Sequence, residues 1–115
     1  MQTVYPLVRY RDPRAGIDFL VKALGFTERE VSASDDGTVY HAELAFGDGI
    51  VMIGAGDPGG PGVYLAAADP DAAHDVAAAA GAKITMGLTD QPYGSREFGC
   101  EDPEGNRWYL GTYRP

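Results

Sequence analysis

The sequence predicts an α+β fold made of two βαβββ modules, and an internal repeat is the main reason. Asp12-Pro13 precedes an apolar stretch that reaches Gly25, and Asp69-Pro70 precedes a second one that reaches Gly81. The offset between the two stretches is 57 residues at the start and 56 at the end. In each half a short apolar strand follows an acidic turn ending in glycine. A repeat of about this length indicates two copies of one supersecondary unit.

In the first half, helix signals and turn residues predict one helix and four strands. Asp12 is a favourable N-cap, Pro13 suits the first helical position, and Gly25 ends the helix. Hairpin turns are expected at Ser34-Asp35-Asp36-Gly37 and Gly47-Asp48-Gly49. The predicted strands are Thr3–Tyr10, Thr27–Ser32, Val39–Phe46 and Gly49–Gly54.

The second half repeats this order after a Gly- and Pro-rich linker, Ala55–Gly62. Its predicted elements are a strand over Val63–Ala67, a helix over Pro70–Ala80, and strands over Lys83–Leu88, Ser95–Glu101 and Asn106–Tyr113. We therefore expect one domain over residues 1–115, with modules 1–57 and 59–115. Two curved mixed sheets would enclose a cleft, and clefts of this kind hold small ligands. The sequence leaves open whether the cleft lies within one chain or is shared by two.

Composition restricts the partners. The 115 residues carry 17 acidic and 9 basic side chains, a net charge of -8, which disfavours nucleic acids and anionic membranes as partners. The single Cys100 excludes an internal disulfide and a cysteine-based zinc site, and it fits a reducing cytoplasm. No signal peptide and no apolar run long enough for a membrane helix is recognisable. A cytoplasmic location is the expectation.

Two segments carry a resemblance to a known family: YRDPRAGIDFLVKALGF near the start and PYGSREFGCEDPEGNRWYLGTYRP at the end. With them the chain resembles the vicinal oxygen chelate superfamily, or glyoxalase/bleomycin-resistance/dioxygenase fold. It is most similar to small bacterial glyoxalase-like and PhnB-like proteins. The resemblance implies paired modules around a cavity and a homodimer. It also implies a divalent metal in the enzymes of the family and none in its antibiotic-binding members.

The metal positions that the resemblance implies are Tyr5, Ile53, Gly62 and Tyr109. Gly and Ile offer no side-chain ligand and neutral Tyr is a poor one, whereas divalent metals need several His or carboxylate donors. We therefore expect no metal and no cofactor.

The candidate ligand-binding residues follow from strand alternation. His41 and Glu43 share one face of their strand, opposite the more apolar face of Tyr40, Ala42 and Leu44. Glu97 is the repeat mate of His41. If the apolar faces meet the helices, one cleft would be lined by Tyr5, Arg9, His41, Glu43, Tyr64, Glu97 and Tyr109.

Several other side chains are expected to be structural or solvated. His74 lies among Asp71 and Asp75 on the second helix and should face solvent. Arg96 and Arg107 are expected to pair with surface acids, and Trp108 and Leu110 should lie in the core. Cys100 precedes Glu101 and Asp102, and nearby negative charge disfavours a nucleophilic thiolate.

Three functions remain open from the sequence. The first is metal-independent binding of a small organic molecule, including sequestration of an antibiotic or secondary metabolite. The second is a glyoxalase-like lyase or isomerase that uses His41, Glu43 or Glu97, or a metal at an atypical site. The third is a structural or regulatory partner without a ligand, which a space filled by side chains would favour.

Overall fold

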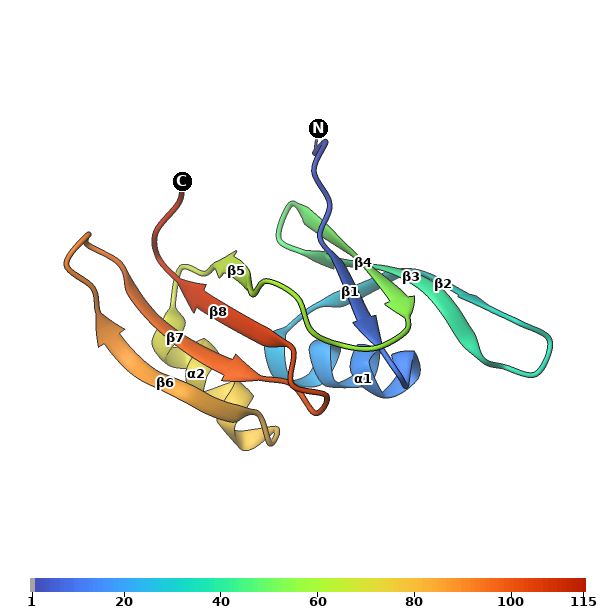
Figure 1. The fold of residues 1–115 in the computed structure, drawn as a ribbon. Helices are drawn as coiled ribbons and strands as arrows, with labels where there is room; N and C mark the ends of the chain where they lie inside the picture. The colour runs from blue at the N-terminus through green and yellow to red at the C-terminus, as the bar shows by residue number, and fades with distance from the viewer. Residues whose placement is uncertain (1) are drawn as a thin grey trace.

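The computed structural model of the chain describes residues 2–115 and contains two modules of the same element order (Figure 1). Met1, where the predicted first module begins, lies outside the described residues. The first module contains β1 (Leu7–Tyr10), α1 (Pro13–Leu24), β2 (Thr27–Ala33), β3 (Val39–Phe46) and β4 (Gly49–Ala55). The second contains β5 (Val63–Ala66), α2 (Pro70–Ala79), β6 (Lys83–Asp90), β7 (Arg96–Glu101) and β8 (Arg107–Gly111).

Each module forms its own four-stranded mixed sheet. The strand orders are β1-β4-β3-β2 and β5-β8-β7-β6, in which β1 pairs with β4 and β5 with β8 in parallel. The other pairs are antiparallel. The predicted α+β class and the two modules are thus confirmed. The two sheets do not close into one barrel, and the described chain is elongated, 49 × 32 × 22 Å.

The two helices begin in the same way because the same residues start them. Asp12 accepts a hydrogen bond from the backbone N–H of Ala15 at 3.2 Å, and Asp69 accepts one from Ala72 at 3.1 Å. A proline follows each cap, where its missing N–H costs no helical hydrogen bond. Gly25 ends α1 in the left-handed conformation at φ 80°, which glycine adopts without strain.

The core joins the two modules on the helix side of the sheets. In Figure 1, α1 and α2 both lie beneath the sheets, and the two helices pack against each other. The Phe26 ring contacts Phe46 of its own module and Trp108 of the other, with centroids 5.2 and 5.6 Å apart. Trp108 is fully buried and Leu110 is 1% exposed, which confirms their predicted core position.

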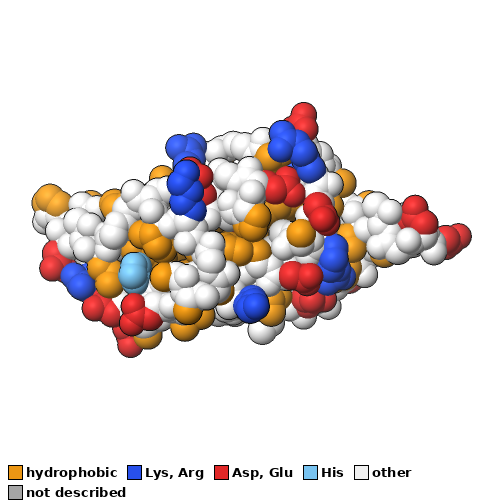
Figure 2. All heavy atoms as spheres, turned by 90° about the horizontal axis from the view of Figure 1, so that it is seen from below, with side chains coloured by type: hydrophobic (Ala, Val, Ile, Leu, Met, Phe, Trp, Pro, Cys, Tyr) orange, Lys and Arg blue, Asp and Glu red, His pale blue; other side chains and the backbone are white. Residues whose placement is uncertain are grey.

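Seen from the helix side, acidic and basic side chains are intermixed with apolar ones, as Figure 2 shows. None of the helices within residues 2–115 has the length and apolar character that crossing a membrane requires.

Two sequence predictions about the strands are wrong. The predicted strand Thr3–Tyr10 begins only at Leu7, because the side-chain amide of Gln2 takes over the pairing with β4. It donates to the Ile50 carbonyl and accepts from the Ile50 N–H, both at 2.8 Å. Tyr40 is 57% exposed rather than packed with Ala42 and Leu44, since a register irregularity at the start of β3 buries Val39 instead.

A buried carboxylate links the modules. The Asp102 Oδ2 atom accepts hydrogen bonds from the Tyr10 hydroxyl at 2.5 Å and from the Trp108 Nε1–H at 3.1 Å. Asp102 Oδ1 accepts from the backbone N–H groups of Glu104 and Asn106, both at 3.0 Å. Burial and the adjacent Asp102 charge both raise the pKa of Tyr10, so its hydroxyl stays a donor.

The same turn also contacts the beginning of α1. The Glu104 carboxylate accepts the backbone N–H groups of Arg11 at 2.7 Å and Asp12 at 2.9 Å. The Asn106 side-chain amide donates to the Arg9 carbonyl at 3.0 Å. The DPEGN turn, which carried the family resemblance, therefore acts structurally by fixing the second module on β1 and α1 of the first.

We predict that Tyr10→Phe lowers the free energy of unfolding by about 1.5–3 kcal/mol, because Asp102 loses a hydrogen bond in a buried site. Asp102→Ala should cost more, since it leaves the Tyr10 hydroxyl and the Trp108 N–H without their acceptor. Urea unfolding measures both. The control is Tyr40→Phe on the exposed ring, which should be nearly neutral. Equal stability of Tyr10→Phe and wild type would contradict the role assigned to Asp102.

Candidate functional site

The face of each sheet turned away from the helices, here called its open face, carries most of the predicted site residues. On the first sheet, Arg9, Gly54 and His41 form one cross-strand row. Leu7, Met52 and Glu43 form the next. The intervening residues Ala42 and Leu44 are fully buried on the helix side. His41 and Glu43 therefore lie on the open face, as strand alternation predicts.

The open face of the second sheet carries the two predicted tyrosines. Tyr64, Tyr109 and Gly99 form a row across β5, β8 and β7. The Tyr109 ring lies between two glycines: a Cβ added at Gly62 would meet it at 2.7 Å and one at Gly99 at 3.0 Å. Tyr5 precedes β1 and is 41% exposed, with its hydroxyl donating to the Gln2 carbonyl.

Glu97 is the most enclosed of the predicted site residues, with 6% of its surface exposed. Its carboxylate accepts hydrogen bonds from the Tyr93 hydroxyl at 2.5 Å and the Ser95 hydroxyl at 2.9 Å. The bond to Glu97 raises the pKa of Tyr93 to about 12. Tyr113 stacks edge-on against Tyr93 at 5.8 Å, so the C-terminal segment helps to cover this carboxylate.

Within one chain the structure does not bring the three acid–base candidates together. His41 Nε2 lies 3.7 Å from Glu43 Oε2, and both side chains are about one-third exposed. Glu97 is the mate of His41 in the fold as well, because each pairs with a glycine of the following strand. The two residues belong to separate sheets, however, each two strands away from the edge strand β1 or β5.

The residues at the expected metal positions do not fit a divalent metal. Ile53 is fully buried and faces α1, so Met52 takes the open-face position equivalent to Tyr109, and the true repeat offset here is 57 rather than 56. A thioether is a poor ligand for hard cations. At Gly62 the Tyr109 ring fills the space that a donor side chain would need. Within residues 2–115 no three His, Cys, Asp or Glu side chains are grouped to hold a metal.

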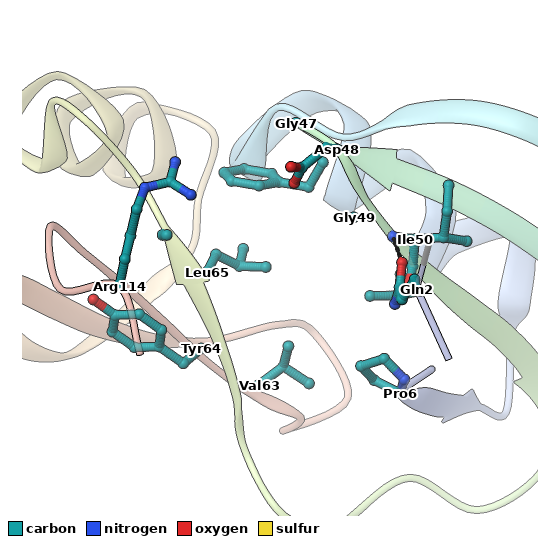
Figure 3. Close-up of a pocket in the computed structure, with 13 residues that line it drawn as sticks. Gln2, Pro6, Gly47, Asp48, Gly49, Ile50, Val63, Tyr64, Leu65 and Arg114 are labelled. Carbon is teal, nitrogen blue, oxygen red and sulfur yellow. Dashed lines mark hydrogen bonds between the residues drawn. The ribbon is translucent and has the colours of Figure 1, made fainter. Parts of the chain in front are cut away.

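Two cavities flank the seam between the sheets at pseudo-equivalent places. The first, which we call the apolar pocket, has a volume of about 490 Å³ and lies between the turn into β4 and strand β5 (Figure 3). Its walls include Phe46, Ile50, Tyr64 and Leu65.

The polar groups of the apolar pocket lie at one end. Asp48 and Arg114 project from opposite walls toward this end in Figure 3. The sequence did not single out these two residues or Phe46. The internal repeat could have indicated them. The Gly47–Gly49 turn is equivalent to the DPEGN turn, but it does not make the contacts that the DPEGN turn makes to the other module.

The second cavity, the basic pocket, has a volume of about 480 Å³ and is bordered by β1, residues 59–62 and the start of β8. Arg9 and Tyr64 both line it. A third, smaller hollow contains Tyr5 and Glu43 beside Arg29. Four of the seven predicted ligand-binding residues thus line these three hollows, whereas His41, Glu97 and Tyr109 line none of them.

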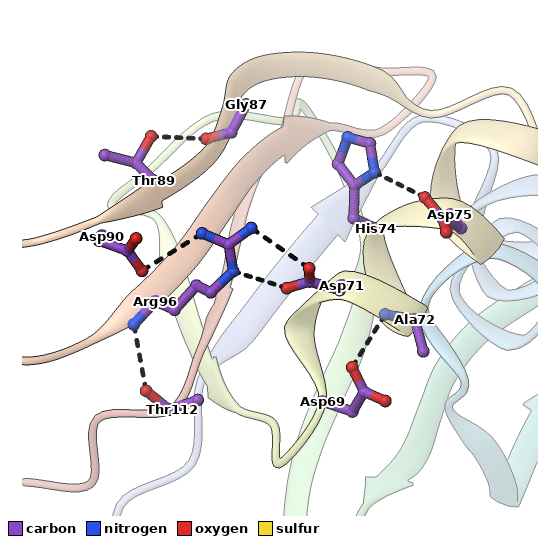
Figure 4. Close-up of polar contacts among 10 residues, drawn as sticks. All are labelled: Asp69, Asp71, Ala72, His74, Asp75, Gly87, Thr89, Asp90, Arg96 and Thr112. Carbon is purple, nitrogen blue, oxygen red and sulfur yellow. Dashed lines mark hydrogen bonds and ion pairs between the residues drawn. The ribbon is translucent and has the colours of Figure 1, made fainter.

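The two remaining arginines considered in the sequence analysis differ in whether they form ion pairs. Arg96 forms a two-point contact with Asp71 at 2.7 and 3.2 Å and also reaches Asp90 at 3.2 Å (Figure 4). These partners raise the pKa of Arg96, and its hydrogen bond lowers that of Asp71. Arg96 is therefore structural, as expected. Arg107 forms no ion pair among residues 2–115, contrary to the prediction.

His74 differs from its predicted solvated position. Its side chain is only 24% exposed because the ring packs edge-on against Phe98, with centroids 5.3 Å apart. Its Nδ1 lies 3.2 Å from Oδ1 of the exposed Asp75, the next residue of α2 (Figure 4). The ring thus covers part of the core between α2 and β7.

Comparison with known proteins places this fold. Residues 3–110 match the model of the glyoxalase/bleomycin resistance protein/dioxygenase superfamily. The chain belongs to this superfamily. An uncharacterized protein of Mycobacterium bovis is 32% identical, over 87% of this chain and 76% of that protein.

Solved structures agree with this assignment. The crystal structure of TioX from Micromonospora sp. ML1 is 31% identical with a TM-score of 0.83, covering 97% of this chain and all of that one. A glyoxalase I mutant from Zea mays shares the fold at 17% identity and a TM-score of 0.81, over 99% of this chain and 46% of that one.

We predict that the thiol of Cys100 reacts slowly in the folded protein. The side chain is 1% exposed, and burial raises its pKa from 9.0 to about 11. Alkylation by iodoacetamide at pH 8 should therefore proceed at the normal rate only in urea. The unfolded thiol loses its proton first, so the free energy of unfolding should fall between about pH 9 and 11. In Cys100→Ala this part of the pH dependence should be absent. Rapid alkylation of the native protein would contradict the prediction.

We also predict that the protein retains no stoichiometric zinc, nickel, iron or manganese after metal loading and dialysis. Elemental analysis should find far less than about one metal per chain, with no change in Tyr109→Ala, because the position lacks donors. A metal content of about one per chain that is lost in Tyr109→Ala would overturn this.

Proposed function

We propose that this protein binds a small organic molecule without a metal, and that sequestration of an antibiotic or other secondary metabolite is its role. The observation that carries the proposal is the apolar pocket. Its volume of about 490 Å³ matches a small-molecule site, and aromatic and aliphatic side chains dominate its walls. Asp48 and Arg114 at one end supply the few polar groups that orient a ligand.

The open faces extend this site. Tyr64 borders both cavities at the seam, and Tyr109 neighbours it in the same cross-strand row. Aromatic rings of this kind give large contact area at low conformational cost. In the proposal the contacting residues remain those predicted from the sequence: Tyr5, Arg9, His41, Glu43, Tyr64, Glu97 and Tyr109.

A homodimer belongs to the same proposal. The helices cover one side of both sheets and leave the open faces uncovered on the other (Figure 1). A second copy facing them would set the first sheet of one chain opposite the second sheet of its partner. His41 and Glu43 would then share a cleft with a tyrosine-lined face. The family resemblance supports this arrangement, as does the failure of the two sheets to close within one chain.

The alternative is a lyase or isomerase, and the contact between His41 and Glu43 favours it. The two side chains lie 3.7 Å apart on the same open face, so a substrate bound there would meet an imidazole and a carboxylate that could exchange protons with it. This reading requires turnover that is lost in His41→Ala while ligand binding persists.

We expect a thermal-shift screen of aromatic and heterocyclic compounds to find a binder that raises Tm by several degrees, since a ligand that binds only the folded state stabilises it. Tyr64→Ala, Tyr109→Ala and His41→Ala should each reduce the shift at equal ligand concentration. Tyr40→Ala removes an exposed ring outside the cavities and is the matched control. Shifts that are unchanged in all three site variants would contradict the proposed site.

A further inference from the structure

The basic pocket has a charge pattern unlike the rest of the chain. Its 13 lining residues include two arginines, Arg9 and Arg107, and no aspartate or glutamate. The chain as a whole carries 17 acidic and 9 basic residues. Among the side chains that line this cavity of about 480 Å³, the only charged ones are therefore positive.

Both arginines are available to a ligand. Other basic residues form ion pairs with acids, as Arg11 does with Asp57 and Arg96 with Asp71. Neither Arg9 nor Arg107 forms an ion pair in the part of the chain that the structure describes. The Arg107 Nη2 atom makes only a 3.3 Å hydrogen bond to the Gly60 carbonyl.

The pocket wall is held in place by the chain itself. The Asn106 side chain donates to the Arg9 carbonyl and accepts from the Gly59 N–H, both at 3.0 Å. It thereby joins β1 to the linker. Gly59 and Gly60 have φ values of 111° and 143°, which L side chains rarely adopt, so this wall depends on glycine. The stem of Arg9 lies against Gly56.

The internal repeat provides a comparison within the molecule. The mate of Arg9 is Ala66, since both pair with the equivalent glycines Gly54 and Gly111. The mate of Arg107 is Ile50, and each stands near the start of the last strand of its module. Ala66 and Ile50 line the apolar pocket. One seam cavity is therefore apolar at the two positions where the other is cationic.

We propose that the basic pocket binds the anionic group of the ligand, a carboxylate or phosphate, between the guanidinium groups of Arg9 and Arg107. Guanidinium groups match the planar or tetrahedral oxygens of such anions and hold them by charge-assisted hydrogen bonds. Tyr64 borders both cavities and can contact the organic part. This inference rests on the proposed function and specifies its ligand as an organic anion.

The test is an NMR titration of the isotopically labelled full chain with three probes: sodium 2-naphthoate, the neutral 2-naphthamide, and inorganic phosphate. Arg Nε–H signals and the backbone amides of Gly59, Gly60 and Gly62 report on the basic pocket. We expect naphthoate to shift these signals and to bind at least about tenfold more tightly than naphthamide. Arg9→Ala and Arg107→Ala should each remove most of this difference. Lys22→Ala is the control, because it removes one positive charge from an exposed position of α1 that borders neither cavity.

Each outcome is decisive. Binding of phosphate as tight as that of naphthoate, lost in the same two variants, would support an anion site that is indifferent to the organic part. Equal binding of naphthoate and naphthamide, unaffected by Arg9→Ala and Arg107→Ala, would overturn the anion site and leave the proposed function intact. An equal loss in Lys22→Ala would show that the difference comes from the net charge of the protein, and it would also overturn the anion site. Failure of all three probes to shift the pocket signals would overturn the anion site, whereas the proposed function fails only with the broader ligand screen.

Discussion

The buried carboxylate of Asp102 is the contact on which the relation of the two modules depends. It lies 5% exposed between them and accepts hydrogen bonds from Tyr10 of the first module and Trp108 of the second. A buried charge is tolerated only where such donors replace water. The bond to Tyr10 fixes the end of β1, which carries Arg9, while the following turn places Asn106 and Arg107 beside it. The seam cavities on the open side are thus positioned by a hydrogen-bond network on the helix side.

Much of the fold could be predicted from local chemistry. The capping residues Asp12 and Asp69, and the turns near Gly37 and Gly105, act within a few residues of themselves, so their positions follow from sequence. The beginning of β1 could not be predicted in this way. It depends on a long-range contact, in which the Gln2 amide pairs with Ile50 in place of a backbone segment. Tyr40 was misplaced for a related reason, since the register irregularity of β3 against β2 has no local signal.

The candidate site could likewise be predicted only where local sequence decides the structure. Alternation placed His41 and Glu43 on the open face, and the repeat identified Glu97 as the mate of His41. Alternation reports only the face of a strand, however. It does not say that Glu97 is covered by Tyr93 and Ser95, or which side chains from different sheets share a hollow. Counting from the turns also misplaced Ile53 by one position, because the hairpin that links Glu97 to its partner Gly111 is one residue longer than the equivalent hairpin that links His41 to Gly54.

The position of the Tyr109 ring has a consequence for binding thermodynamics. Gly62 and Gly99 stand on either side of the ring so closely that a methyl group at either would need to move it. A side chain held in such a slot has already lost its rotamer freedom when the chain folds. A ligand that stacks on Tyr109 therefore meets an ordered surface and incurs little further entropy loss on the protein side. The same slot couples these positions in sequence, since a larger residue at position 62 would be tolerated only together with a smaller one at position 109.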